Sequence, residues 1–433
     1  MKNLSITFLM LLFFSGCVQK NKEEKKQLAE TILSDVTLQK VDSMARVVIG
    51  SGLNAGSGYS QIWARDMNTF IETATEITDK EVLRGAILLF FALQQPNHEM
   101  IDGYVLKTDF NWGDDHPYYS DAAPKHVAFK NTVETDQESS LIQLVGKYVA
   151  KTGDTSILQE KVAGMTVLDR MTAMIDYLLN EKYSKKYGLI YGAMTADWGD
   201  VQPNDDFGCD YNELSTPAID VYDNAMLIIA LDYLTAMTQN KTQSQRWITL
   251  RKQLATNVRK YLWDEQHQKF IPHIYLDKNP IPADFDENTI TYHGGTAVAI
   301  EAGLLSKKEI ATVNKQMLAN VKASGMKTIG LTLYPVYPEG FFHGGMSKAY
   351  TYQNGGDWTW FGGRMIQQLI ANGFVKEAYE EVRPMIDRVL KNKGFYEWYG
   401  PGEVPSGSGH FKGSAGVLAK SIELFNEWAE AQQ

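Results

Sequence analysis

Along most of the chain, apolar residues recur at the three- and four-residue spacing that places them on one face of an α-helix. Several of the segments with this pattern are followed by Gly or Asn, which commonly end helices. From about residue 27 onward, the pattern therefore predicts a mainly helical chain. The clearest predicted helices cover residues 83–95, 139–153, 167–183, 222–240, 244–263, 307–321, 365–390 and 414–430.

Two of these segments are apolar around most of the helix circumference, namely "AILLFFAL" (86–93) and "AMLIIAL" (225–231). Such helices are buried on more than one side. A toroid in which an outer ring of helices covers an inner ring would bury them in this way. We therefore predict one all-α domain, a toroid of helical hairpins whose connecting loops gather at one end.

The segments between the predicted helices are long and rich in Gly, Trp, Tyr, Asp and Asn. Loops of this length inside a compact domain are usually functional. Strand signals are sparse, and the best ones, at residues 269–276 and 330–338, predict small β-hairpins within the loops. We expect these loops and hairpins to form the active-site end of the toroid.

The first residues have the pattern of an export signal: Lys2, then the apolar run "ITFLMLLFF", then "SGC" ending at Cys17. We predict a signal peptide at 1–16, a lipid on Cys17, a tether at 17–26 and a catalytic domain at 27–433. The protein would then be an exported bacterial lipoprotein, periplasmic or at the cell surface, that meets the membrane only through its lipid. An ordinary secretory signal is the alternative.

Composition and charge reduce the number of possible functions. The chain has 433 residues and a net charge of −10, without a basic stripe, which argues against nucleic acid as a partner. Once Cys17 carries a lipid, Cys209 is the only thiol left, so we expect no intrachain disulfide and a structural thiol. The acidic stretch 197–213 leaves calcium as an alternative, but it lacks EF-hand spacing, and no zinc ligand set is visible. We expect no metal, no other cofactor, and a monomer.

The first candidate motif is "IWARD" at 62–66, in which Trp63, Arg65 and Asp66 precede a predicted helix. We interpret it as a carboxylate at the mouth of a cavity, where it can bind sugar hydroxyls; a pair of surface charges is the alternative. The second motif, "TDQE" at 135–138, offers Asp136 and Gln137 as further sugar ligands. Its alternative is helix capping, because acids are favoured at helix N-termini.

The third motif is "ADWGD" at 196–200, where two acids bracket a tryptophan. Trp198 could stack on the apolar face of a pyranose while Asp197 and Asp200 bind its hydroxyls. On one helical turn the two acids, three residues apart, would face the same side. A carboxyl held against an indole also keeps its proton more readily, which suits a general acid.

Two further motifs follow near the C-terminus. The segment "YQNGGDWTW" (352–360) offers polar groups and aromatic ring faces that could bind a sugar. A structural turn is the alternative. In "YEWYGP" (396–401), Glu397 lies between aromatic residues and is a candidate general base, with Glu403 as the weaker alternative. The expected sugar-binding residues of these two motifs are Asn354, Gly356, Asp357, Trp358, Trp360 and Trp398.

Together and in this order, the motifs resemble those of the six-hairpin glycosidases, over residues from about 45 to 425. That superfamily includes glucoamylases, processing and debranching α-glucosidases, trehalases, and cellobiose and chitobiose phosphorylases. The resemblance implies an (α/α)6 barrel that cleaves glycosidic bonds, generally with inversion. It also implies that Asp200 is the general acid, that Arg65 and Asp66 hold the non-reducing-end sugar, and that Glu397 is the general base.

The phosphorylases carry a large N-terminal β-domain, for which the residues before Trp63 are too few, so we expect hydrolysis. The expected protein is an exo-acting, inverting glycoside hydrolase of a neutral oligosaccharide, with an α-glucoside as the best guess. Two alternatives stay open. A polysaccharide lyase of the same toroid fold would need a basic cleft, whereas these motifs are acidic. A non-catalytic glycan-binding lipoprotein would have no use for paired acids.

Overall fold

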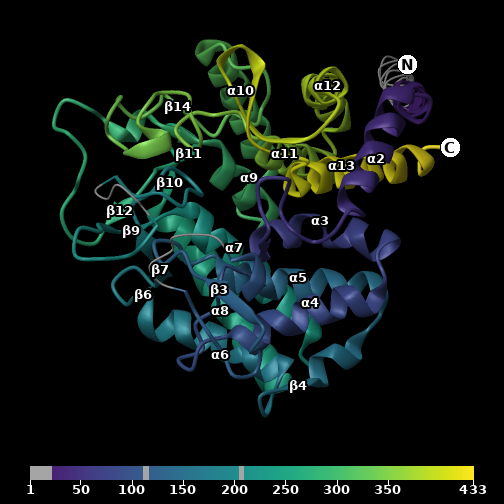
Figure 1. The fold of residues 1–433 in the computed structure, drawn as a ribbon. Helices are drawn as coiled ribbons and strands as arrows, with labels where there is room; N and C mark the ends of the chain where they lie inside the picture. Colours follow the sequence, from purple (N-terminus) through teal and green to yellow (C-terminus); the bar gives the residue numbers. More distant parts are fainter. Residues whose placement is uncertain (1–21, 111–116, 204–208) are drawn as a thin grey trace, which may run out of the picture.

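The computed structural model describes residues 22–110, 117–203 and 209–433 (Figure 1). The expected signal peptide and Cys17 therefore lie outside the described residues. Within the expected tether, residues 22–26 are helical, as part of a helix over 22–33 whose side chains start to pack at Ala29. Over the described ranges, every helix is too short or too polar to cross a membrane.

Six helices form a closed inner ring. In this ring α3 packs on α5, α5 on α7, α7 on α9, α9 on α11, α11 on α13, and α13 back on α3. This arrangement confirms the predicted all-α fold class and the (α/α)6 toroid. The inner helices are α3 (Ala64–Ile77), α5 (Gln137–Thr152), α7 (Val221–Met237), α9 (His293–Glu301), α11 (Thr359–Ala371) and α13 (Lys412–Glu430).

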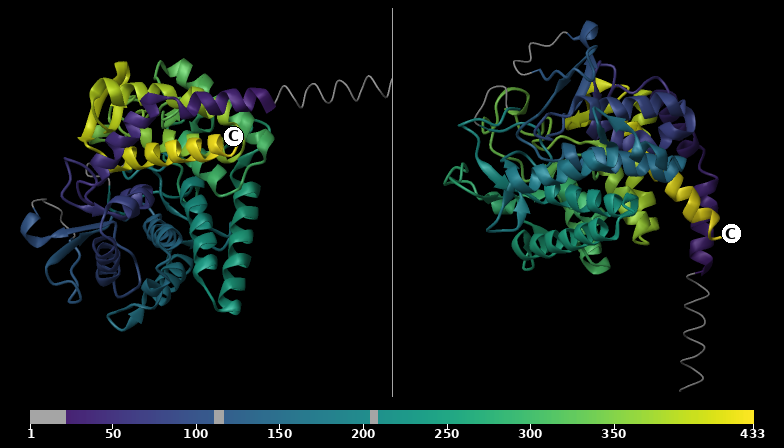
Figure 2. Two further views of the ribbon diagram at one scale, coloured as in Figure 1. Left: turned by 90° about the vertical axis from the view of Figure 1, so that its right-hand side faces the viewer. Right: turned by 90° about the horizontal axis from the view of Figure 1, so that it is seen from below.

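The outer helices alternate with the inner ones along the chain and pack around them. Figure 1 shows the C-terminal α13 beside α2, which bridges the two ends of the chain, and Figure 2 (left) shows the antiparallel pair α7 and α8 in teal. The outer helices are α2 (Val36–Ile49), α4 (Lys80–Leu93), α6 (Val167–Glu181), α8 (Lys241–Tyr261), α10 (Lys307–Ser324) and α12 (Val375–Asn392).

The inner helix α7 and the outer helix α8 differ in how much of their surface is buried. In α7, residues 221–231 are all buried, because the helix is covered on one side by α8 and on the other by α5 and α9. In α8, only Trp247, Leu254 and Val258 are buried, on the single face that meets α7. The all-round apolar sequence of α7 and the amphipathic sequence of α8 follow from these positions. The other segment that is apolar all round, residues 86–93, lies in the outer helix α4, where Leu88 and Leu89 are only partly buried.

Short strands decorate the loops. They form two three-stranded sheets, β1–β2–β3 and β12–β9–β8, and two-stranded pairs that include the hairpin β15–β16 and the pair β13–β14, whose strands are separated in the chain by α9 and α10. The predicted strand signals correspond to β11, β12 and β14. The strands are β1 (Ile62–Trp63), β2 (Gly103–Leu106), β3 (His126–Phe129), β4 (Lys161–Val162), β5 (Met165–Thr166), β6 (Tyr183–Ser184), β7 (Leu189–Ile190), β8 (Gly192–Ala193), β9 (Pro217–Ile219), β10 (Trp263–Asp264), β11 (Lys269–Phe270), β12 (Ile274–Tyr275), β13 (Thr291–Tyr292), β14 (Leu333–Tyr334), β15 (Tyr396–Gly400) and β16 (Val404–Gly409).

The structure divides the predicted segment 365–390 into two helices, α11 and α12. Gly373 adopts a left-handed φ of 80° between them and turns the chain from the inner to the outer ring. Because each outer helix returns the chain in this way, the inner helices run parallel and begin at the same end of the toroid. That end carries the functional candidates.

Candidate active site

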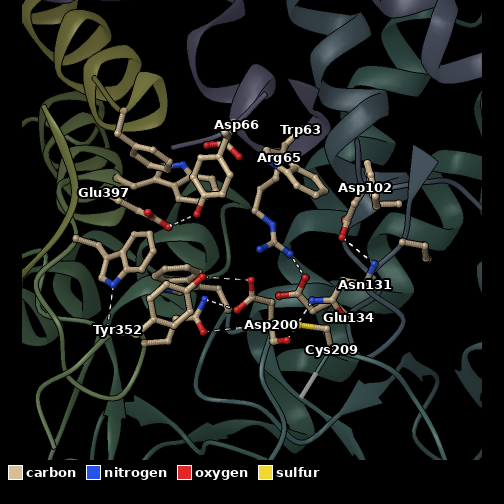
Figure 3. Close-up of a pocket in the computed structure, with 18 of the residues that line it drawn as sticks. Trp63, Arg65, Asp66, Asp102, Asn131, Glu134, Asp200, Cys209, Tyr352 and Glu397 are labelled. Carbon is tan, nitrogen blue, oxygen red and sulfur yellow. Dashed lines mark hydrogen bonds and ion pairs between the residues drawn. The ribbon is translucent and has the colours of Figure 1, made fainter. Parts of the chain in front are cut away.

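A cavity of about 260 Å³ opens at the end of the toroid where the inner helices begin (Figure 3). Its walls come from the N-termini of α3, α11 and α13, from the segment before α5, from β15, and from the loop between β8 and β9. The lining residues are Tyr59, Trp63, Arg65, Asp66, Asp102, Phe129, Lys130, Asn131, Glu134, Trp198, Asp200, Cys209, Asp210, Tyr352, Gln353, Trp358, Trp360, Glu397 and Phe411.

Glu397 reaches the cavity from strand β15 and is only 4% exposed. Its Oε1 accepts a hydrogen bond from the Tyr59 hydroxyl at 3.0 Å, and its Oε2 accepts one from the main-chain N–H of Ser408 at 2.7 Å. Burial, together with the nearby charge of Asp200, raises the pKa of Glu397 to about 7 in spite of both hydrogen bonds. A carboxyl with this pKa exchanges a proton readily near neutrality.

Asp200 faces the same cavity from the loop between β8 and β9. Gln353 holds its side chain with a 2.7 Å hydrogen bond from Nε2 to Oδ1, and Asn131 holds its main-chain oxygen at 3.1 Å. Tyr352 adds a longer contact of 3.4 Å from its hydroxyl to Oδ2. Asp200 and Glu397 are thus fixed by separate partners, from segments about two hundred residues apart in the sequence, and share one cavity.

Asp66 lies in the first turn of α3, between Glu397 and Arg65 in Figure 3. Its side chain is 8% exposed, and its Oδ1 has no hydrogen-bond partner among the described residues. Burial and the charge of Glu397 raise the pKa of Asp66 to about 7, although Arg65 opposes them. A buried oxygen without a partner on a cavity wall is suited to bind a hydroxyl group of a ligand.

Arg65 extends into the cavity beside two carboxyls. Asp136 accepts hydrogen bonds from Nε and Nη2 of Arg65, both at 2.8 Å, and Glu134 accepts another from Nη2. Burial opposes ionisation of Asp136, but the charge and hydrogen bonds of Arg65 hold its pKa below the usual value. Burial raises the pKa of Glu134 well above its usual value, and Arg65 does not compensate.

Aromatic side chains form one wall of the cavity. The rings of Trp198 and Trp358 meet edge to face with centroids 4.7 Å apart, and Trp360 lies between Trp198 and Phe411 at 5.7 and 6.1 Å. Away from this wall, Trp63 packs on Phe129 at 6.0 Å. Such faces can stack on the apolar side of a sugar ring.

Asp197 does not line the cavity, contrary to the expectation that it faces the same side as Asp200. The segment is a turn rather than a helix, and Asp197 has a left-handed φ of 59°. Its two carboxyl oxygens accept the main-chain N–H groups of Gly294 and Gly295 at 2.7 and 2.8 Å, in the first turn of α9. A Cβ on Gly294 would lie 2.2 Å from the ring of Trp198, so glycine is required for this close approach.

Asp136 and Gln137 also lie behind the cavity wall, and the interpretation of both as direct sugar ligands is corrected. Asp136 is fully buried and holds Arg65, as described above, while also accepting the Tyr222 hydroxyl at 2.8 Å. Gln137 donates to the main-chain oxygen of Asn131 and accepts from Lys130. Both residues orient groups that do reach the cavity.

In the segment 352–360, too, some of the expected sugar-binding residues line the cavity and others do not. Trp358 and Trp360 line the cavity, whereas Asn354, Gly356, Asp357 and the later Trp398 do not. Asn354 pairs with the main chain of Tyr337, and Asp357 binds the buried Arg388 at 2.8 Å. Gly356 fits under the main-chain oxygen of Tyr352, and Trp398 packs against the Tyr352 ring. These contacts hold the loop in place.

Several lining residues were not singled out from the sequence, or were given no part in the site. Cys209, interpreted as structural, lines the cavity, and burial raises the pKa of its thiol. Glu134 was overlooked although it lies two residues before Asp136. Among the described residues, no group of His, Cys, Asp and Glu side chains is arranged to hold a metal ion. The others not singled out from sequence are Tyr59, Asp102, Phe129, Lys130, Asn131, Asp210, Tyr352, Gln353 and Phe411.

A family model described as amylo-alpha-1,6-glucosidase matches residues 125–421 of the chain. This range includes Glu134, Asp200 and Glu397, but it begins after Arg65 and Asp66. A search among curated proteins finds no significant match.

Solved structures share the fold at low sequence identity. The GH63 mannosylglycerate hydrolase of Thermus thermophilus, in complex with Tris and D-glycerate, superposes with a TM-score of 0.62 at 13% identity, over 88% of this chain and 99% of that one. A rhamnosidase from Klebsiella oxytoca with rhamnose bound gives 0.58 at 12% identity, over 89% and 63%. The GH78 rhamnosidase of Bacillus sp. GL1 gives 0.58 at 14% identity, over 89% and 34%.

Proposed function

The chain belongs to the amylo-alpha-1,6-glucosidase family of six-hairpin glycosidases, and on this premise we propose that it is an exo-acting, inverting hydrolase of a neutral oligosaccharide. Asp200 would protonate the oxygen of the leaving group, while Glu397 removes a proton from the water that attacks the opposite face of the sugar. The observation that carries the proposal is the presence of both carboxyls in one cavity, each fixed by its own partners.

The arrangement around Glu397 supports its role as the base. The Tyr59 hydroxyl and the Ser408 N–H both stabilise the ionised carboxylate, and together they leave it one fixed orientation. An inverting enzyme needs a water between the base and the sugar, with the two carboxyls roughly 6.5–9.5 Å apart. In the productive form Asp200 carries a proton and Glu397 does not.

The cavity supports an exo mode of action and a neutral substrate. Its volume of about 260 Å³ lies just below the roughly 300–1,000 Å³ of pockets for drug-sized ligands, so it suits the end of a glycan better than an internal run of sugars. The lining cations Arg65 and Lys130 are already paired with carboxyls, at Asp136 and Glu138 respectively. A polyanionic substrate, such as a lyase requires, would meet no available positive charge among the described residues of the lining.

The function is tested by incubating the purified protein with a panel of α- and β-linked neutral disaccharides and following the products by proton NMR. We expect hydrolysis of at least one α-glucoside, with the released sugar first seen in the β-configuration, because water attacks the face opposite the leaving group. Release of the α-anomer would contradict inversion. An unsaturated product, detected by ultraviolet absorbance, would show that the reaction is an elimination and not a hydrolysis.

The pH dependence of the reaction should report Glu397. Because burial raises its pKa to about 7 and the base must be ionised, kcat/KM should rise with pH until about pH 7. In Tyr59→Phe the carboxylate loses a hydrogen bond that lowers its pKa, so the acidic limb should move to higher pH by about half a unit to one unit. The measurement is kcat/KM from pH 4 to 9.

Tyr396→Phe is the matched control for that shift, since Tyr396 neighbours Glu397 in β15 but does not line the cavity. Its acidic limb should coincide with that of the wild type. An acidic limb of Tyr59→Phe that stays in place or moves to lower pH would show that another group controls it.

A further inference from the structure

Glu134 occupies the part of the cavity wall that lies beyond Asp200 as seen from Glu397 (Figure 3). It stands in the segment between β3 and α5, and its side chain is 5% exposed. One oxygen, Oε2, accepts a hydrogen bond from Nη2 of Arg65. The other, Oε1, is buried and has no hydrogen-bond partner among the described residues.

Support of Arg65 does not account for this carboxyl. Asp136 already accepts hydrogen bonds from both Nε and Nη2 of Arg65 and balances its charge. Glu134 is therefore a second buried carboxyl on one guanidinium group. A buried polar atom left without a hydrogen bond costs about 1–3 kcal/mol. Glu138 also has such an oxygen, Oε2, but of the two residues only Glu134 lines the cavity, where a ligand hydroxyl can supply the missing hydrogen bond.

Glu134 and Glu397 both lie near Asp200, and Figure 3 draws them to either side of it. Asp200 is among the charges that raise the pKa of Glu134 and among those that raise the pKa of Glu397. Asn131, three residues before Glu134, donates to the main-chain oxygen of Asp200. In an inverting reaction the base and the leaving group lie on opposite faces of the sugar. If the glycosidic oxygen lies at Asp200 and the attacking water at Glu397, the leaving group extends toward Glu134.

We propose that Oε1 of Glu134 forms a hydrogen bond with a hydroxyl of the sugar that departs. This inference rests on the proposed function, because it uses the assignment of Asp200 as the acid and Glu397 as the base. It adds a residue that binds the leaving group of the substrate.

The test compares two substrates that share the transferred sugar: the best disaccharide of the panel and the corresponding glycosyl fluoride, whose leaving group has no hydroxyl. In Glu134→Leu, kcat/KM for the disaccharide should fall about 10- to 100-fold, as expected for one hydrogen bond to a carboxyl group. The value for the fluoride should change less than about threefold. Glu134→Gln, which can still bind a hydroxyl, should recover most of the loss.

Glu138→Gln is the control for a purely structural effect. Glu138 is buried a few residues further along but does not line the cavity, and it binds Lys130 and the Met100 N–H. Any loss of activity in this variant should be equal for the two substrates. If Glu134→Leu loses the same factor in kcat/KM on both substrates, the proposal is overturned and Glu134 only supports Arg65.

Calorimetry separates this proposal from the proposed function. For the wild type, we expect a sulfur-linked analogue of the disaccharide, which is not hydrolysed, to bind more tightly than the non-reducing-end monosaccharide, and Glu134→Leu should remove most of that difference. If the disaccharides of the panel bind without being hydrolysed, the proposed function fails, but the ratio of the two measured affinities still decides the role of Glu134. If no sugar binds the wild type, both are overturned. Hydrolysis with an unchanged ratio overturns the role of Glu134 alone.

Discussion

Glu397→Gln should lower kcat about 10²- to 10⁴-fold on every substrate, because it removes the group that accepts the proton of the attacking water. Burial and the neighbouring Asp200 hold the pKa of this carboxyl at about 7, so the wild-type residue is a competent base near neutrality. The loss should be as large for a glycosyl fluoride as for a disaccharide, since both reactions need an activated water. The measurement is kcat for the two substrates under saturating conditions.

The fold should survive this substitution. A glutamine at position 397 keeps one oxygen that can accept the Ser408 N–H, so the circular dichroism spectrum and the melting temperature should change little. Glu403→Gln is the matched control, because this acid follows in the same hairpin, is partly exposed, and does not line the cavity. Activity above a tenth of the wild-type value in Glu397→Gln would contradict its role as the base.

Part of the architecture could be predicted because the inner helix α7 is buried on more sides than the outer helix α8. The segment "AMLIIAL" is apolar all round and lies in α7, which has neighbours on both sides, whereas α8 shows one apolar stripe. Helix α9 was missed because its nine residues begin "HGG" and give almost no periodic signal. Its glycines serve tertiary contacts with Trp198 and Asp197, which a local pattern cannot reveal.

The site was predictable in its composition but not in its orientation. Asp66, Asp200 and Glu397 do line one cavity, yet Asp197 turns to the N-terminus of α9 because of one left-handed residue conformation. The sequence pattern cannot distinguish two acids three residues apart unless the backbone between them is known. Likewise, Asp357 resembles a ligand in sequence, but the structure pairs it with Arg388 from α12, an ion pair formed between distant segments.

Asp200→Asn should separate the two catalytic roles, because its effect should depend on the leaving group. An amide cannot donate an acidic proton, so we expect kcat for the disaccharide to fall about 10²- to 10⁴-fold. Fluoride departs with little help from an acid, so the same variant should retain a much larger share of its activity on the glycosyl fluoride. The ratio of the two losses is the measurement.

Gln353 offers a matched control for that ratio. It donates to Asp200 Oδ1 at 2.7 Å, so Gln353→Leu should disturb the position of the acid without removing its proton, and produce the same leaving-group dependence in weaker form. Retention of most disaccharide activity in Asp200→Asn would contradict the assignment of this residue as the acid. Equal losses on both substrates would instead give Asp200 the role of orienting the water or the sugar. The candidate acid would then be the neighbouring Glu134, because burial raises the pKa of its carboxyl well above the usual value.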